Sequence, residues 1–226
     1  RELFKSPVLC DFAVAVAAAG RSSLPSLPKQ KQPREGGLPL SFSQQRLWFL
    51  DRLEPGSAFY NMPCALEIEG ELDVAALAQA LLALEERHEA LRTVFREEGG
   101  EVRQHILERS GAQLAVDSLT GATDSQLREA LQAEGRQAFD LERGPLWAAR
   151  LWQAGERRHV LGLTLHHIIA DGWSLSVLVR ELGALYEAQR QGKPAGLAAL
   201  PLQYADFAHW QRSHLSGEVD EAELAY

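Results

Sequence analysis

Several short stretches of the chain place an apolar residue at every second position, which is the pattern of a half-buried strand. In CALEIEG, residues 64–70, the apolar residues Cys64, Leu66 and Ile68 are each separated by one small or acidic residue. The same kind of pattern predicts further strands over residues 93–97, 102–107, 147–153 and 158–166.

Elsewhere apolar residues recur every three or four positions, and this spacing predicts helices. Two helices have capping signals, because Ser41 and Gln44 form a capping box and Asp73 is a favoured N-cap. We expect helices over residues 41–53, from 73 to about 91, and over 125–138, 173–191 and 203–215. The expected buried stripes are Phe42, Arg46, Phe49 and Leu50 in the first helix, and Leu77, Leu81, Leu84, His88 and Leu91 in the second.

The order of these elements indicates the fold class and the domain organisation. Strands and helices are mixed without strict alternation, which predicts an α/β (α+β) mixed-sheet sandwich. This regular pattern fills residues 38–226. Before it lie a turn and an Ala-rich helix in residues 1–19, and then a Pro- and Gly-rich stretch, residues 20–37, typical of a solvated linker.

Composition narrows the function classes. The net charge is −8 and the basic residues are scattered, so we expect no nucleic-acid partner. The run FAVAVAAAG, residues 12–20, is too short to span a bilayer and no basic stretch precedes it. We therefore expect no membrane association and a cytoplasmic location. Cys10 and Cys64 have no metal-binding spacing and are expected to be reduced and buried.

The chain begins with Arg1, and its sole methionine is Met62. The last residues, EVDEAELAY, stop within an expected helix. We expect the sequence to be a piece of a longer protein.

The stretch LTLHHIIADGWSL, residues 163–175, introduces polar chemistry into an apolar sequence. Strand alternation points His166 and His167 to opposite faces, which argues against a shared metal ion, so no metal site is expected. His167 is the candidate to accept a proton or to stabilise charge. Asp171 has the position of a helix N-cap, and Gly172 would permit a close backbone approach.

Four strings, in order, resemble the core motifs of nonribosomal peptide synthetase condensation domains. They are LSFSQQRLWFL (residues 40–50), RHEALRTVF (87–95), HHIIADG (166–172, the HHxxxDG signature) and YADFAHW (204–210). The later motifs of the family are absent, so the resemblance implies the N-terminal, chloramphenicol-acetyltransferase-like lobe without its C-terminal lobe. Residues 1–19 are similar to the C-terminal tail of a peptidyl carrier domain, which makes residues 20–37 an intermodular linker.

The resemblance implies an acyltransferase that forms an amide bond. The amine of an acceptor aminoacyl thioester would attack a donor thioester, both carried on phosphopantetheine arms of upstream and downstream carrier domains. No cofactor would be bound directly. The missing C-terminal lobe and an adjacent adenylation domain would be further partners. His167 would act as general base or would stabilise the intermediate, and both roles stay open.

The resemblance also implies roles for neighbouring residues. Asp171 would be structural, as would His166 and Gly172, and Asp171 would pair with Arg92 or Arg87. Helical spacing alone instead puts Arg87 on a solvated face. Trp173 would line the substrate channel, although a Trp at a helix start is more often packed. Three aromatic residues at helical spacing are interpreted as core: Tyr204, Phe207 and Trp210.

Two alternatives remain beside peptide-bond formation. An epimerisation-type domain also carries HHxxxDG, although the first motif resembles the condensation form. The chain could instead be a catalytically incompetent docking or structural lobe, because the family's active site lies between two lobes and the chain by itself is expected to be inactive. A carrier-like tail leading directly into the lobe favours an L-configured donor.

Overall fold

The computed structural model describes residues 8–18 and 31–214. The helices are α2 (Leu9–Ala18), α3 (Phe42–Leu53), α4 (Val74–Arg87), the 3₁₀ helix η1 (Glu89–Arg92), α5 (Asp124–Gly135), α6 (Gly172–Gln191) and α7 (Tyr204–His214). The strands are β1 (Leu38–Pro39), β2 (Asn61–Glu69), β3 (Thr93–Glu98), β4 (Glu101–Ile106), β5 (Leu114–Ser118), β6 (Trp147–Gln153) and β7 (Arg158–His166).

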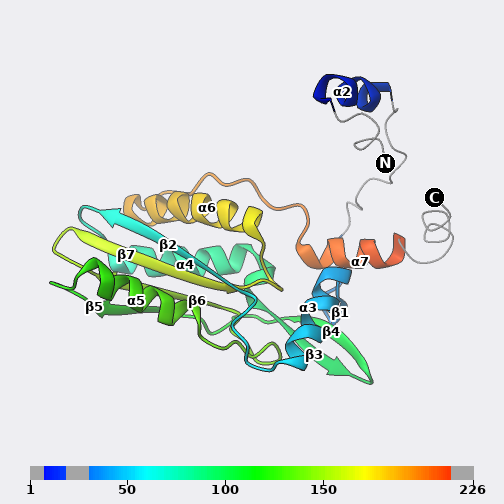
Figure 1. Ribbon diagram of the computed structural model, residues 1–226, viewed down its shortest axis with the longest axis horizontal. Coiled ribbons are helices and arrows are strands. Elements are labelled where there is room, and N and C mark those ends of the chain that lie inside the picture. Colours follow the sequence, from blue (N-terminus) through cyan, green and yellow to red (C-terminus); the bar gives the residue numbers. More distant parts are fainter. Residues whose placement is uncertain (1–7, 19–30, 215–226) are drawn as a thin grey trace.

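A four-stranded sheet in the order β2-β7-β6-β5 forms the centre of the fold (Figure 1). Only the β5–β6 pair is parallel, so the sheet is mixed. Helices α4 and α6 pack together on one face, where Leu161, Leu163 and Leu165 of β7 belong to the largest apolar cluster. This arrangement confirms the predicted mixed-sheet sandwich.

Helix α5 covers the opposite face of the same sheet (Figure 1). Its Leu127 packs with Trp152 and Val160. Gly162 makes room for the indole, because a Cβ at that position would lie 2.6 Å from a ring carbon of Trp152. β7 is therefore buried on both faces from His159 to its last residue, His166, and the exposed His167 follows directly.

A smaller sheet in the order β1-β4-β3 lies near α3 and α7. Its first strand joins it through Leu38 and Pro39, which pair with Gln104 and Arg103 of β4. The Gln104 side chain adds a 2.7 Å hydrogen bond to the Pro39 carbonyl oxygen. This strand leads directly into Ser41, the N-cap of α3.

The structure corrects several sequence expectations. β1 and β5 were not predicted. β1 has only two residues, and the polar residues of β5 both lie at its end, so neither strand shows an alternating pattern of apolar and polar residues. α3 buries Gln44 and Leu47, whereas Phe42 and Phe49 of the predicted stripe are 43% and 57% exposed. Cys10 is exposed and Cys64 half-buried, so the expected burial of both is wrong.

The end of the predicted linker also differs from expectation. Gln32 and Arg34 make hydrogen bonds to the lobe instead of standing free in solvent. Residues 20–30 of that linker, and residues 1–7 and 19 of the predicted carrier tail, lie outside the described residues.

Candidate functional site

A pocket of about 290 Å³ lies at the C-terminal end of β7. α3, the turn after β7 and the first residues of α6 and α7 form its walls. The lining residues are Ser43, Gln44, Arg46, Leu47, Tyr60, His167, Ile168, Ile169, Ala170, Asp171, Ser174 and Tyr204. Three of the four family-like motifs contribute side chains here.

The two histidines diverge as strand alternation predicts. His166 is 2% exposed and packs near the rings of Phe139 and Tyr60. Its Nδ1 accepts a 3.2 Å hydrogen bond from the Ile168 backbone N–H. Burial, and then the neighbouring His167, lower the pKa of His166 to about 4. His166 is therefore neutral at physiological pH and stays part of the wall behind the pocket.

His167 lines the pocket itself and is exposed. Its backbone N–H donates a 2.8 Å hydrogen bond to the Tyr60 carbonyl oxygen, which extends the β2–β7 pairing by one residue. The backbone at position 167 is thus fixed by the sheet while the imidazole is free to meet a ligand. A proton acceptor needs this combination of a held backbone and an accessible ring nitrogen.

The start of α3 supports the same turn. Ser41 and Gln44 make both hydrogen bonds of the predicted capping box. The Gln44 amide lies 3.5 Å from the Ile168 carbonyl oxygen, and the Ser41 hydroxyl lies 3.0 Å from the Tyr204 hydroxyl. Gln44, Tyr60 and Tyr204 were missed as site residues, although the capping box had already marked where α3 begins.

Asp171 caps α6, as its sequence position indicated. Its carboxylate accepts hydrogen bonds of 2.8 Å and 2.6 Å from the Ser174 backbone N–H and hydroxyl. These two bonds are the main reason why the pKa of Asp171 lies below its ordinary value, and the charge of His167 lowers it further.

The predicted pairing of Asp171 with Arg92 or Arg87 is wrong within this lobe. Arg87 forms an ion pair with Glu181, at 2.8 Å, and Arg92 donates to the Leu107 carbonyl oxygen, at 2.6 Å. Arg87 is therefore not on a solvated face. His88 is not a helix core residue either, because α4 ends at Arg87 and the His88 imidazole lies 2.7 Å from Glu181.

Gly172 and Trp173 open α6 beside the pocket. Apart from its two chain neighbours and the nearby backbone of α6, no heavy atom lies within 4 Å of a Cβ built at Gly172, so no packing contact in the described lobe requires glycine there. Trp173 is 82% exposed, and the interpretation that it is simply packed is wrong.

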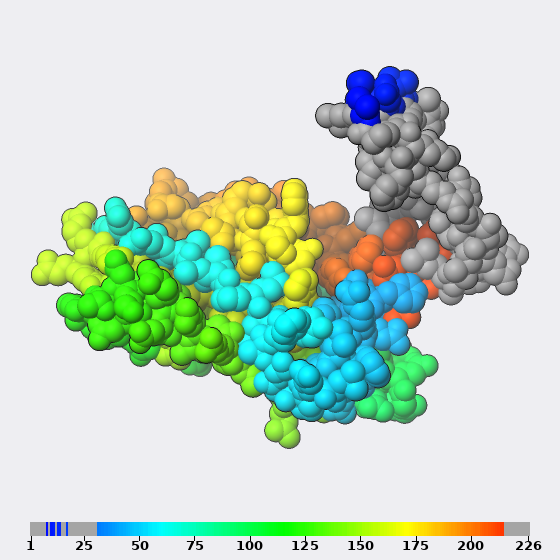
Figure 2. Space-filling model, in the orientation of Figure 1, coloured from blue at the N-terminus to red at the C-terminus, as the bar shows by residue number. Residues whose placement is uncertain are grey.

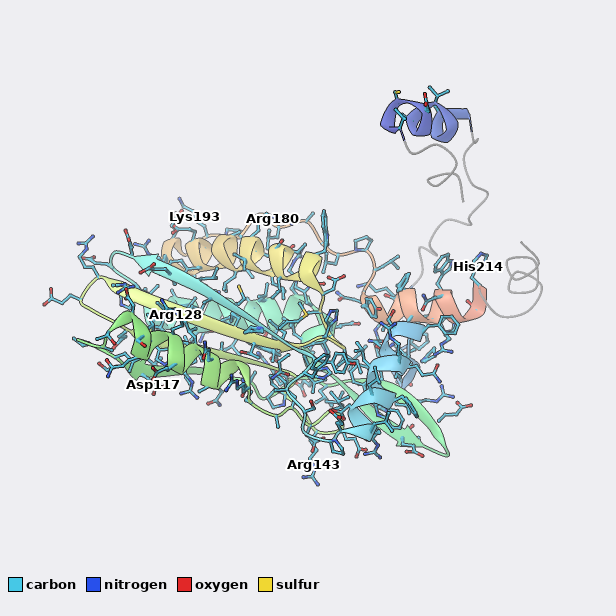
Figure 3. The ribbon with its side chains drawn as sticks, viewed as in Figure 1. Asp117, Arg128, Arg143, Arg180, Lys193 and His214 are labelled. Atoms are coloured by element: carbon cyan, nitrogen blue, oxygen red, sulfur yellow. The ribbon has the colours of Figure 1, made fainter. Side chains whose placement is uncertain are left out.

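The aromatic residues of α7 are not core, which corrects their predicted role. Tyr204 is 41% exposed. Tyr204, Phe207 and Trp210 follow one another along the helix with ring centroids 5.5 Å and 5.9 Å apart. The row ends where Trp210 stacks on His214, labelled in Figure 3 at the C-terminal end of α7. These rings cover the helix surface and only Tyr204 reaches the pocket.

Within residues 8–18 and 31–214, no three or more His, Cys, Asp or Glu side chains gather as they would around a metal ion. None of the helices described there has the length and apolar composition needed to cross a bilayer.

Comparison with known proteins identifies the family. Residues 34–226 match the family model described as the condensation domain. The chain belongs to the condensation domain family. It is 46% identical over 232 aligned residues to a linear gramicidin synthase protein of Brevibacillus parabrevis, with the whole chain aligned. This condensation-domain chain spans only 3% of the length of that synthase.

Solved structures give the same result for the fold. The X-domain from teicoplanin biosynthesis superposes with a TM-score of 0.76 at 37% identity, covering 85% of this chain and 41% of the X-domain chain. That X-domain has also been solved in complex with OxyB. The first condensation domain of the calcium-dependent antibiotic synthetase, bound to a substrate analogue, has a TM-score of 0.76 at 25% identity. The match covers 84% of this chain and 46% of the chain of that condensation domain. The fold is thus the predicted chloramphenicol-acetyltransferase-like lobe.

Proposed function

We propose that this chain is the N-terminal lobe of a peptide-bond-forming condensation domain in a nonribosomal peptide synthetase. The contrast between two adjacent histidines carries the proposal. His166 is buried and neutral, while His167 lines a pocket. Of the two imidazoles, only that of His167 is accessible, and it lies in the pocket where a substrate could react.

The reaction requires an amine and a thioester to meet at this imidazole. The acceptor nitrogen attacks the donor carbonyl carbon, the C–S bond breaks, and the donor arm leaves as a thiolate. The attacking nitrogen becomes cationic and must lose one proton. As general base, His167 accepts this proton; in the alternative role, His167 stabilises the charged intermediate and the leaving thiolate takes the proton. Holding both thioesters at one point supplies much of the rate gain, because the encounter becomes effectively intramolecular.

The pocket suits part of this task. Its volume of about 290 Å³ lies at the lower limit of small-molecule sites. Solved relatives are covered over 41% and 46% of their length, so a second lobe would supply the opposite wall. The donor and acceptor would arrive on phosphopantetheine arms of carrier domains, and Trp173, exposed beside the pocket, would line the channel they use.

The domain order follows from the same proposal. Residues 1–19 are the tail of an upstream carrier domain, residues 20–37 the linker, and residues 38–226 the lobe. The downstream carrier and an adenylation domain complete the set of partners. Because no epimerisation region stands between the carrier tail and the lobe, the donor is L-configured.

A second function is favoured by one comparison. The teicoplanin X-domain, 37% identical to this chain, has been solved in complex with OxyB. A lobe of this fold could therefore act as a docking platform for another protein instead of as a catalyst. A transfer assay separates the two functions, because a platform binds its partner without turnover.

The test is dipeptide transfer between two loaded carrier proteins. We would use this chain alone, this chain mixed with its separately expressed C-terminal lobe, and the intact two-lobe domain as the reference. Product from the intact domain, and from the mixture but not from the single lobe, is the expected result. An intact domain that binds both carriers but forms no dipeptide would overturn the proposal in favour of the docking function.

A further inference from the structure

Two of the family-like motifs do not supply the reacting groups, and they meet at one place. Glu89 lies in RHEALRTVF and Asp206 lies in YADFAHW. Both carboxylates bind the guanidinium of Arg34, which comes from the segment that precedes the lobe. In Figure 2, light-blue atoms from the part of the chain that includes β1 lie against the orange α7.

Asp206 is built as a receptor for that segment. Its side chain is completely buried. Its carboxylate accepts hydrogen bonds from both terminal nitrogens of Arg34, at 2.8 Å and 3.0 Å, and from the Gln32 backbone N–H, at 2.7 Å. The Gln203 backbone N–H adds a fourth, at 2.8 Å. A paired, bidentate arrangement of this kind is strong and directional.

The clamp extends to a second element of the lobe. Arg34 Nε lies 2.8 Å from a Glu89 oxygen. The Gln203 side chain accepts from the Glu89 backbone N–H, at 3.1 Å, and donates to the Arg87 carbonyl oxygen, at 3.0 Å. η1 and the start of α7 are therefore held together around one arginine.

The same helix turn that holds Arg34 also reaches the pocket. Tyr204, two residues before Asp206, lines the pocket and lies 3.0 Å from the Ser41 hydroxyl. Between the two contacts, the chain from Arg34 runs through β1 to Ser41. The preceding segment is thus fixed by the first turn of α7, the same turn that supplies Tyr204 to the pocket.

We propose that Arg34, clamped by Asp206 and Glu89, fixes the end of the segment that arrives from the upstream carrier and thereby positions that carrier toward the pocket. Arg34 is a positioning residue in this scheme. The inference rests on the proposed function, because it takes the upstream carrier as the donor. With the clamp intact, the connection between the upstream carrier and the lobe ends at Gln32. Without the clamp, this connection extends to the start of β1.

The charge state of the clamp supports this role. Burial raises the pKa of Asp206, but the hydrogen bonds from Arg34, Gln32 and Gln203 outweigh it, so the pKa lies below its ordinary value. The guanidinium pKa of Arg34 is raised, mainly by its hydrogen bond to Asp206. Both partners are fully ionised at neutral pH.

The experiment uses the intact synthetase that contains this sequence. Its own upstream carrier is loaded with an unlabelled donor, and a free copy of the same carrier, loaded with a ¹³C-labelled donor, competes for the same acceptor. The ratio of unlabelled to labelled dipeptide compares the attached carrier with the free one. Arg34→Gln and Asp206→Asn release the clamp, and Arg109→Gln, which breaks the exposed pair with Glu86, is the matched control.

We expect Arg34→Gln and Asp206→Asn to lower the ratio about twofold to fivefold, since a longer connection lowers the effective concentration of the attached carrier. Arg109→Gln should leave it unchanged. Hydrogen exchange provides an independent readout: the Gln32 amide should be protected in the wild type and exchange at least about tenfold faster in Arg34→Gln. A purely structural role would lower both products equally and leave the ratio unchanged.

The outcomes separate the two proposals. An unprotected Gln32 amide in the wild type, or an unchanged ratio once the amide exchanges freely, overturns the positioning role. An intact wild-type synthetase that yields neither dipeptide overturns the proposed function instead, while the exchange data still show whether the clamp forms.

Discussion

Two aspartates, 35 positions apart in the sequence, lie in different surroundings. Asp171 lies at the pocket, and Asp206 lies where the segment that precedes the lobe is bound. Asp171, at the pocket, is exposed, and its carboxylate accepts hydrogen bonds from Ser174 and from its own backbone, within its own helix start. Asp206 is buried and accepts four hydrogen bonds from three residues, two of which, Gln32 and Arg34, are remote in the chain. The two residues lie near the starts of consecutive helices, α6 and α7.

The two carboxylates mark one region of the lobe that is held by its own contacts and one that stays accessible. Both carboxylate oxygens of Asp206 are satisfied by the preceding segment and by Gln203, so this region defines structure. At the pocket, His167 and Asp171 keep accessible atoms that a ligand or the second lobe can use. Groups that act on substrates need such accessibility, whereas buried charges need partners.

The largest expected effect comes from the pocket side of this comparison. His167→Ala should lower dipeptide transfer by the intact domain at least about 100-fold, because a general base contributes about that much or more. Its melting temperature should stay within about 1 °C, since the side chain is exposed. Rapid-quench transfer assays and a thermal melt measure the two. His209→Ala, a half-buried imidazole on α7 outside the pocket lining, is the control, and wild-type transfer in His167→Ala would reject the role.

Much of the fold could be predicted because its signals are local. Strands β6 and β7 were predicted with their observed bounds, since each is an unbroken apolar or alternating run. The α3 capping box was readable from Ser41 and Gln44. The buried face of α3 was not, because Gln44 is polar and Phe49 apolar while tertiary contacts bury the first and expose the second. Hydrophobicity alone could not reveal which face meets the lobe.

The next effect concerns the buried neighbour of His167. The folded-state pKa of His166, about 4, lies below the ordinary 6.5, so the unfolded chain binds the extra proton first as the pH falls. Stability is therefore full above about pH 6.5 and is lost as the pH falls toward 4, by about 2 kcal/mol between pH 7.5 and 5. Urea unfolding across this range measures it. In His166→Gln, the free energy of unfolding should lose this part of its pH dependence. A pH dependence as steep as that of the wild type would mean that His166 titrates normally.

Replacing Asp206 should lower the stability of the lobe by a similar amount, and this loss should already be present at neutral pH. Asp206→Asn leaves Arg34 partly buried beside a neutral amide, and we expect about 2 to 3 kcal/mol lower free energy of unfolding. Asp117→Asn is the matched control, because Asp117 is 49% exposed where it pairs with Arg150 at the edge of the central sheet (Figure 3). The control should lose less than about 1 kcal/mol. Equal losses in urea unfolding would contradict the comparison.

The orientations of the two histidines could be predicted from the sequence, whereas the long-range ion pairs could not. Opposite faces for His166 and His167 follow from strand alternation, which β7 obeys up to its last residue. The capping of α6 by Asp171 followed from its sequence position. The partners of Arg87 and Arg92 could not be derived, because each bond depends on another segment of the chain. Glu181, which binds Arg87, lies 94 positions away, and Arg34 and Asp206 are 172 positions apart. Sequence spacing carries no signal for such pairs.

The smallest expected effect returns to Asp171. Asp171→Ala removes the cap of α6 and should cost about 1 kcal/mol, the usual value for an N-cap, measured by urea unfolding. The change remains small because water can reach the freed backbone N–H groups. Asp171→Ser keeps a capping oxygen and should recover most of that stability. If Asp171 only caps α6, transfer activity should recover in Asp171→Ser as well. A stable Asp171→Ser domain that stays inactive would instead show that the exposed carboxylate acts on the substrate or binds the second lobe.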